Sequence, residues 1–190
     1  KIAAKINKKF LEVILAKGFE KNSLNILKRK KNLRIIDISE YKSKNKTNIK
    51  IFEGAFLVQN KDKIILDRKK LKCVTKLKPS KRELNEIEFT FSVSKYVKSN
   101  AIVLCNNFST IGIGAGQPSR FDSCKIAIQK AKKFQPQKIK NSIAASDAFF
   151  PFTDGVEALI KAGVKIIIQP GGSIRDQEVI NFANKGKVKM

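Results

Sequence analysis

The sequence predicts an α/β fold in which helices and strands alternate along the chain and pack in layers. Short β-branched and apolar runs, typical of buried strands, are separated by segments whose apolar residues recur at helical spacing. The chain has 190 residues, of which 42% are hydrophobic. That is enough for one sizeable core or two small ones, so we expect one or two domains.

The opening part of the chain predicts the order helix, strand, helix, strand. Apolar residues between Ile2 and Phe10 share a helical spacing, and the run Val13-Ile14-Leu15 is typical of a buried strand. The expected elements are a helix over residues 2–10, a strand over 13–15, a turn at Gly18, a helix over 23–31, a strand over 33–38, a loop over 41–50 and a strand over 52–59.

The rest of the chain alternates more regularly. Ser80 and Glu83 have the spacing of a capping box, which predicts a helix from Ser80 to about Val97. The elements expected after it are a strand pair over residues 101–105 and 109–113, a helix over 119–133, a strand over 144–150, a helix over 153–162, a strand over 164–169, a turn over 170–173 and a helix over 174–184.

The chain carries a large positive charge. Its 40 Lys and Arg against 16 Asp and Glu give a formal net charge of +24, a bias typical of proteins that bind nucleic acid or anionic membranes. The lysines are spread along the chain beside abundant Ile and Asn, which indicates a genome-wide codon bias. The densest runs, residues 28–31 and 68–70, are expected to be solvated. We expect no nucleic-acid partner and no membrane partner, with a basic nucleic-acid-binding protein as the competing interpretation.

Cysteine and histidine usage limits the chemistry. Cys73, Cys105 and Cys124 are widely spaced without a CxxC pair, so neither a disulfide framework nor a metal site is expected. This usage, with no apolar run of bilayer-spanning length and no signal segment, predicts a soluble cytoplasmic protein. The chain has no histidine, so a mechanism confined to it would rely on Lys, Asp, Glu, Cys or Tyr.

A glycine-rich segment, Gly-Ile-Gly-Ala-Gly-Gln-Pro-Ser-Arg at residues 112–120, leaves a predicted strand and enters a predicted helix. Glycines at alternate positions let the backbone approach a ligand closely, and Ser119 can cap a helix whose first N–H groups favour anions. A phosphate or carboxylate site is one interpretation, and a plain tight turn is the other. The spacing fits neither the dinucleotide fingerprint nor the P-loop.

Two further strand-to-helix junctions carry candidate groups. Residues 146–155 read Ser-Asp-Ala-Phe-Phe-Pro-Phe-Thr-Asp-Gly. The aromatic faces suit a flat heterocycle, and an Asp carboxylate can accept hydrogen bonds from the N–H groups of that heterocycle. Alternatively, the phenylalanines are core and Asp154 is an N-cap or first-turn acid. In residues 169–176, Gln-Pro-Gly-Gly-Ser-Ile-Arg-Asp, the simpler interpretation is that Ser173 caps a helix while Arg175 and Asp176 are solvated.

These three segments, in this order, resemble the C-terminal transformylase domain of the bifunctional purine biosynthesis family. That family combines aminoimidazole carboxamide ribonucleotide (AICAR) formyltransferase with inosine monophosphate (IMP) cyclohydrolase. The resemblance covers nearly the whole chain. The segments similar to family signatures are residues 10–14, 30–34, 95–103, 112–120, 145–152 and 168–176.

The resemblance implies cytidine-deaminase-like α/β layers, used in two related subdomains and without the deaminase zinc. Residues 1–75 would form part of the first subdomain and residues 76–190 the second. It implies a homodimer with active sites at the subunit interface. The implied reaction transfers a formyl group from the co-substrate 10-formyltetrahydrofolate to the 5-amino group of AICAR, before ring closure in a cyclohydrolase domain that these residues do not include.

The resemblance also implies site residues, position by position. Asn100 can both donate to and accept from a carboxamide, which makes it a candidate assisting residue. The implied nucleotide-binding residues are Glu12, Asn100, Arg120 and Phe149, and the implied folate-binding residues are Pro151, Phe152 and Asp154.

Two family features are missing from these residues. The family's Lys-His pair, whose His accepts the proton of the attacking amine, would lie upstream of Lys1, and an Arg- and His-rich tail would follow Met190. We therefore expect a piece truncated at both ends, with no catalytic residue of its own and little or no turnover. A non-catalytic ribonucleotide-binding paralogue is the remaining alternative.

Overall fold

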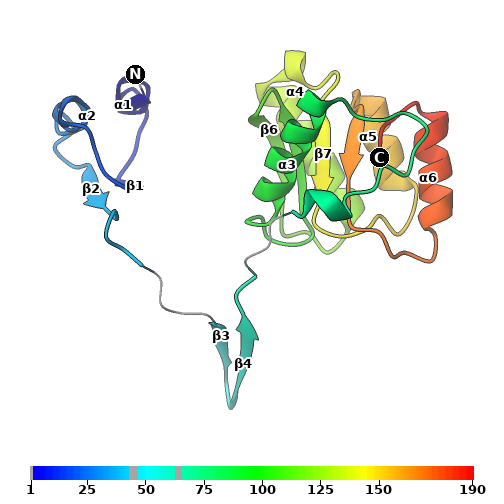
Figure 1. Cartoon of the computed structure of the whole chain (residues 1–190), viewed down its shortest axis with the longest axis horizontal. Helices are drawn as coiled ribbons and strands as arrows, with labels where there is room; N and C mark the ends of the chain where they lie inside the picture. Colours follow the sequence, from blue (N-terminus) through cyan, green and yellow to red (C-terminus); the bar gives the residue numbers. More distant parts are fainter. Residues whose placement is uncertain (1, 43–46, 63–65) are drawn as a thin grey trace. The chain divides into compact units, whose positions relative to one another are not determined.

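The computed structural model describes residues 2–42, 47–62 and 66–190 (Figure 1). Its contacts divide the chain into two compact units, Lys1–Lys61 and Asp62–Met190, rather than at residue 75. The segment before residue 75 belongs to the second unit because the Val74 N–H donates to the Met190 carbonyl at 2.9 Å. The mixed α/β class is confirmed, whereas a relation between two subdomains stays a prediction.

The first unit opens with the expected alternation. Strands β1 (Val13–Ala16) and β2 (Arg34–Asp37) are parallel and follow helices α1 (Ile2–Asn7) and α2 (Lys21–Leu27), respectively. Both helices end earlier than predicted. Only Ala3 of α1 and Leu27 of α2 are buried, so the ends beyond them gain little from packing.

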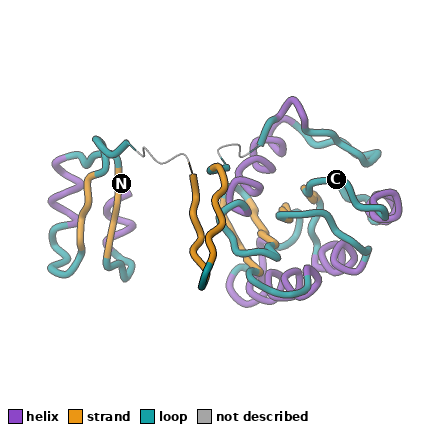
Figure 2. Tube along the Cα trace, turned by 90° about the horizontal axis from the view of Figure 1, so that it is seen from below, coloured by secondary structure: helices purple, strands orange, loops and turns teal. Residues whose placement is uncertain are grey.

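A β-hairpin follows, and here the sequence-based prediction was wrong. Strands β3 (Thr47–Phe52) and β4 (Ala55–Asn60) are antiparallel and joined at Glu53 and Gly54, where Gly54 has a φ of 75° (Figure 2). The predicted loop over residues 41–50 is therefore a strand from Thr47 onward, and the single strand over residues 52–59 contains a turn. Residues 43–46 of that loop lie outside the described residues. Left-handed backbone at Gly54 is what permits the tight reversal.

The second unit is built on a four-stranded sheet in the order β6-β5-β7-β8. The predicted strand pair is confirmed, and the structure shows that its strands β5 and β6 are antiparallel. Strand β5 also pairs antiparallel with β7, and β7 is parallel to β8. The strand predicted over residues 144–150 is shorter than expected, because the chain leaves the sheet at Asp147. The strands are β5 (Ile102–Asn106), β6 (Ser109–Gly114), β7 (Ile143–Ser146) and β8 (Ile166–Ile168).

The helices of the second unit match the predicted ones closely. The capping box is present: the Glu83 N–H donates to Ser80 Oγ at 3.3 Å, and the Ser80 N–H donates to Glu83 Oε2 at 2.6 Å. The helices are α3 (Lys81–Ser94), α4 (Arg120–Phe134), α5 (Asp154–Ala162) and α6 (Asp176–Lys185), with 3₁₀ turns η1 (Arg68–Lys70) and η2 (Pro136–Lys138).

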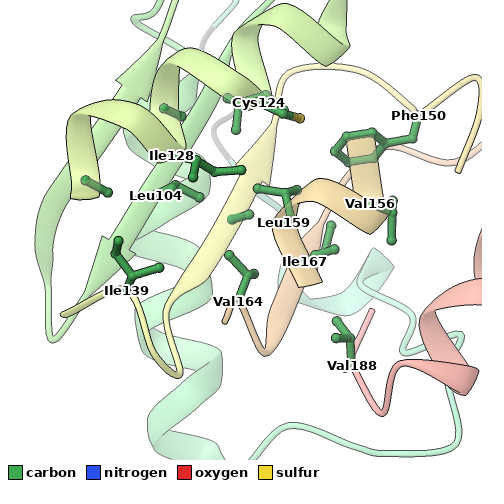
Figure 3. Close-up of a cluster of buried hydrophobic side chains, with 14 of the residues drawn as sticks. Leu104, Cys124, Ile128, Ile139, Phe150, Val156, Leu159, Val164, Ile167 and Val188 are labelled. Carbon is green, nitrogen blue, oxygen red and sulfur yellow. The ribbon is translucent and has the colours of Figure 1, made fainter. Parts of the chain in front are cut away.

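The sheet of the second unit has a hydrophobic layer on each face. Because side chains alternate along a strand, Ile143, Ala145, Ile166 and Ile168 face helix α3, while the intervening residues face α4, α5 and α6. Figure 3 shows the larger layer. Its labelled members are Leu104, Cys124, Ile128, Ile139, Phe150, Val156, Leu159, Val164, Ile167 and Val188.

At two glycines of strand β6, the backbone of helix α4 lies so close that no side chain would fit between them. A Cβ atom at Gly112 would overlap the carbonyl oxygen of Ala127, and one at Gly114 would overlap the carbonyl oxygen of Ser123. Gly116 is different, because its φ is 69° and the nearest atom to an added Cβ would be Lys98 Cγ at 3.4 Å. The first two glycines therefore serve helix–strand packing, and the third serves a turn.

No helix among residues 2–42, 47–62 and 66–190 is long and apolar enough to cross a membrane.

We expect Gly114→Ala to destabilise the chain by about 3 kcal/mol or more, because the backbone of α4 must move away from β6. Gly116→Ala is the matched control and should lose only about 1 kcal/mol, the penalty for a left-handed non-glycine residue. Chemical denaturation of both variants measures the difference. Equal losses would contradict the close-packing argument.

The three cysteines should differ in reactivity. Burial raises the pKa of the Cys105 thiol to about 11 and that of the Cys124 thiol to about 12, whereas Cys73 is exposed. Since the thiolate is the nucleophile, we expect iodoacetamide at pH 8 to modify the native chain at Cys73 alone. Mass spectrometry after brief labelling, with the denatured chain as control, measures the sites. Fast native labelling of Cys124 would show that the α4 layer opens readily.

Candidate functional site

The predicted ligand residues of the second unit gather where β5, β6 and β7 meet their loops. Asn100 lies just before β5, and its side-chain nitrogen donates to the carbonyls of Gln117 at 2.9 Å and Pro118 at 3.0 Å. Its own carbonyl accepts from Ser123 Oγ at 2.7 Å. These bonds fix the Asn100 backbone and side chain between the glycine-rich loop and the first turn of α4.

The orientation of the Asn100 amide follows from its neighbours. The two groups next to the Asn100 amide are the carbonyl oxygens of Gln117 and Pro118, so the donor atom Nδ2 must face them. Both hydrogens on Nδ2 are then used in these hydrogen bonds. Oδ1 then remains, and no described residue donates to it. In this arrangement Oδ1 is the atom of the Asn100 amide left to accept from a ligand, and its contact with a carboxamide stays a prediction.

Arg120, the first residue of α4, is held by two hydrogen bonds. Its Nη1 forms an ion pair with Asp147 Oδ1 at 2.7 Å, and its Nε donates to the Phe149 carbonyl at 3.1 Å. The side chains of Arg120 and Asp147 are only 11% and 15% exposed. The remaining N–H groups on Nη1 and Nη2 are the donors that this guanidinium can offer a ligand.

Asp147 is the residue that sequence reasoning missed. Its carboxylate accepts from Arg120, from the Ala101 N–H at 3.0 Å and from the Ser99 hydroxyl. The sequence alone places Asp147 within the candidate segment 146–155 and assigns it no role of its own. The available signal was its place directly after a buried strand, where a buried carboxylate needs donors from neighbouring strand ends.

The aromatic cluster separates into core and surface. Phe150 is core, at 1% exposure, and packs against Gly155, where an added Cβ would lie 2.9 Å from its ring. Phe149 and Phe152 are 39% and 51% exposed, and the Arg175 guanidinium lies 4.9 Å from the centre of the Phe152 ring. The alternative that all three phenylalanines are core therefore holds for Phe150 alone.

The other predicted folate residues flank α5. Asp154 is the first residue of that helix, is exposed, and accepts from the Gly155 N–H at 2.6 Å through Oδ1. Of the two structural interpretations, Asp154 fits the acidic residue of the first helical turn, because Thr153 is the N-cap. Pro151 precedes the helix and is partly buried.

At the other two junctions, hydrogen bonds within the chain hold the turn that enters each helix. Ser119 caps α4, as predicted, with Oγ accepting from the Asp122 N–H at 3.4 Å. Asp122 places a negative charge in the first turn, which opposes an anion there. Before α6, Gly172 donates to Asp176 Oδ2 at 2.7 Å, and Ser173 accepts from the Arg175 N–H at 3.1 Å. The expected helix start at residue 174 therefore moves to Asp176.

Glu12, the predicted residue near the ribose, belongs to the first unit. It lies just before β1, its side chain is exposed, and its carbonyl accepts from the Arg34 N–H at 2.9 Å. The parallel pairing of β1 and β2 thus fixes its backbone.

A cavity of about 660 Å³ lies elsewhere in the second unit, between α3, β8 and the segment after residue 65. Its wall is mainly apolar, with Leu71, Ile87, Phe91 and Ile168 among its residues. None of the residues predicted to bind nucleotide or folate lines it, so the cavity and the Asn100–Arg120 network are separate features. Residues of the third candidate segment do line it, namely Gln169, Pro170, Gly171 and Asp176.

No group of His, Cys, Asp or Glu side chains within the described part of the chain is arranged to hold a metal ion.

The family model and the individual relatives that match this chain indicate the same protein family. The family model "AICARFT/IMPCHase bienzyme" matches residues 1–130. The chain is 47% identical over 190 residues to the bifunctional purine biosynthesis protein PurH of Thermoanaerobacter sp. (strain X514), covering 100% of this chain and 36% of the relative. It is 45% identical over 193 residues to PurH of Acetivibrio thermocellus, covering 100% of this chain and 37% of the relative.

A third relative, PurH of Aquifex aeolicus, is 42% identical over 188 residues, which is 99% of this chain and 36% of that protein. The chain thus spans a little over a third of the length of these purine biosynthesis proteins. The match of the family model to well over half of the residues, and the identities along the full chain, agree. The chain belongs to the AICARFT/IMPCHase bienzyme family.

Proposed function

We propose that this chain is part of the formyltransferase half of a bifunctional purine biosynthesis enzyme, where it forms part of the AICAR and folate sites. The observation that carries the proposal is the network in which Asn100 and Arg120 are held together at the strand ends of the second unit. The family supplies the reaction: formyl transfer from 10-formyltetrahydrofolate to the 5-amino group of AICAR.

The hydrogen-bonding capacity of the network supports an amino-carboxamide ligand. Asn100 Oδ1 is an acceptor, and the unbonded N–H groups of Arg120 are donors. AICAR carries an amine that donates beside a carboxamide oxygen that accepts. The two sets are complementary, with Asn100 facing the amine and Arg120 facing the carbonyl oxygen.

The charge of the network favours the amino-carboxamide end of AICAR over its phosphate. Asp147 compensates the charge of Arg120, and both side chains are largely buried. A compensated pair provides little net positive charge for a phosphate, whose binding needs uncompensated cations or free backbone N–H groups. The phosphate is therefore assigned to residues outside this network.

The exposed aromatic side chains supply the remaining walls. Phe149 is held beside Arg120 through its own carbonyl and would contact the nucleotide. Phe152, with Arg175 over its ring, would lie on the pterin side with Pro151 and Asp154. Homodimerisation, with the site completed at the subunit interface, is part of the proposal. The alternatives are a non-catalytic ribonucleotide-binding paralogue and a basic nucleic-acid-binding protein.

We expect the chain to bind AICAR and to discriminate for its amine. An analogue that lacks the 5-amino group leaves Asn100 Oδ1 without a donor and should bind at least ~10-fold more weakly, the usual loss for an unpaired buried acceptor. Isothermal titration calorimetry with both ribonucleotides measures the ratio, and a random DNA duplex serves as comparison. Equal affinities for the two ribonucleotides, or tight salt-resistant duplex binding, would overturn the proposal.

We expect the chain alone to show no formyl transfer. It contains no histidine, and an exposed Lys with a pKa near 10.4 is mostly protonated at neutral pH, so it accepts a proton poorly. A positioned base contributes ~10²–10⁴-fold. The spectroscopic assay of 10-formyltetrahydrofolate consumption tests this, with the full-length PurH relative of Thermoanaerobacter sp. (strain X514) as control. Turnover by the 190 residues alone would refute the expectation.

A further inference from the structure

Asp147 is the junction of three segments that carry the proposed nucleotide residues. The Ser99 hydroxyl and the Ala101 N–H, on either side of Asn100, both donate to its carboxylate. Arg120 donates to the same carboxylate from the start of α4. The Asp147 N–H in turn donates to the Ala101 carbonyl at 3.3 Å.

The connection extends to the exposed aromatic residue. Arg120 spans from Asp147 to the Phe149 carbonyl, so the loop after β7 is clamped at two points by one guanidinium. Arg120 therefore bonds to this carboxylate directly, Asn100 lies between two residues that donate to it, and Phe149 is linked to it through Arg120.

We infer that Asp147 is a positioning residue for AICAR: it sets the spacing between the Asn100 acceptor and the Arg120 donors without contacting the ligand. This inference rests on the proposed function. Its physical basis is that a flexible Arg side chain loses rotamer freedom when it binds a ligand, and an Arg already fixed by a buried carboxylate loses less. Fixing the geometry before binding raises affinity through preorganisation.

The main variant is Asp147→Asn, which keeps the size and one acceptor oxygen but removes the charge that holds Arg120. We expect AICAR affinity to fall about ten-fold. The double variant Asp147→Asn with Arg120→Gln should lose no more affinity than Arg120→Gln alone, because Asp147 acts through Arg120. Additive losses would overturn the inference.

A second readout separates positioning from a general loss of stability. In ¹⁵N-labelled protein without ligand, the Arg120 Nε–H should be protected from solvent exchange by its bond to the Phe149 carbonyl, and Asp147→Asn should abolish that protection. Val179→Ala, at a fully buried position of α6, is the control. It should lower stability while leaving both the Arg120 signal and AICAR affinity unchanged.

The outcomes distinguish the two proposals. If the unaltered chain does not bind AICAR, the proposed function fails, while the Arg120 signal still tests whether Asp147 holds the guanidinium. If the chain binds AICAR and Asp147→Asn binds equally well, the positioning role fails. Should Asp147→Asn not fold, Ser99→Ala removes one donor to the same carboxylate and should weaken AICAR binding by about three-fold. Unchanged binding in that variant would count against the inference.

Discussion

The close contact between helix α4 and strand β6 is the constraint on which the second unit depends. Gly112 and Gly114 let the helix backbone approach the strand without intervening side chains. That close approach sets the distance of α4 from the sheet. It therefore also sets where Arg120, the first residue of the helix, lies relative to the strand ends. From there the guanidinium reaches the end of β7. Packing in the core and the polar network at the strand ends are thus two results of one backbone contact.

Few hydrogen-bonding groups of the Asn100–Arg120–Asp147 network remain for a ligand. The nitrogen of Asn100 and the Nε of Arg120 bond to backbone carbonyls, and Asp147 accepts from three donors. A site with many free groups would accept many ligands. Here the remaining groups, one acceptor and the outer N–H groups of one guanidinium, define a narrow pattern.

The fold of the second unit was predictable because its local signals agree with its packing. The Ser80–Glu83 capping box, the continuous run of isoleucines in β8 and the glycine after α5 each specify one structure. The β3–β4 hairpin was missed for a physical reason. Its alternating Asn48, Ile49, Lys50 and Ile51 fit a strand, but all four are exposed, and the polar composition around them predicts a loop.

The site was less predictable than the fold. The glycines of residues 112–116 have the appearance of a ligand loop, yet two of them are occupied by helix packing, which only the distance between α4 and β6 reveals. Asn100 could be singled out by resemblance, but the bonds of its amide nitrogen depend on the carbonyls of Gln117 and Pro118, brought near by the turn after β6. For Asp147 the sequence offers only its place directly after a buried strand, because the residues that donate to its carboxylate lie 27 to 48 positions away.

The capping box of α3 has a consequence for the response of the chain to acid. Burial alone would raise the pKa of Glu83, but hydrogen bonds from Lys189 and Ser80 outweigh it and lower the pKa below the ordinary value of 4.5. The folded chain then binds this proton less readily than the unfolded chain, so the stability that Glu83 contributes is present above pH 4.5 and is lost as the pH falls through the lowered value. Protonation would release Lys189 and the cap together, so that acidification loosens the last residues of the chain and the first turn of α3 in a single step.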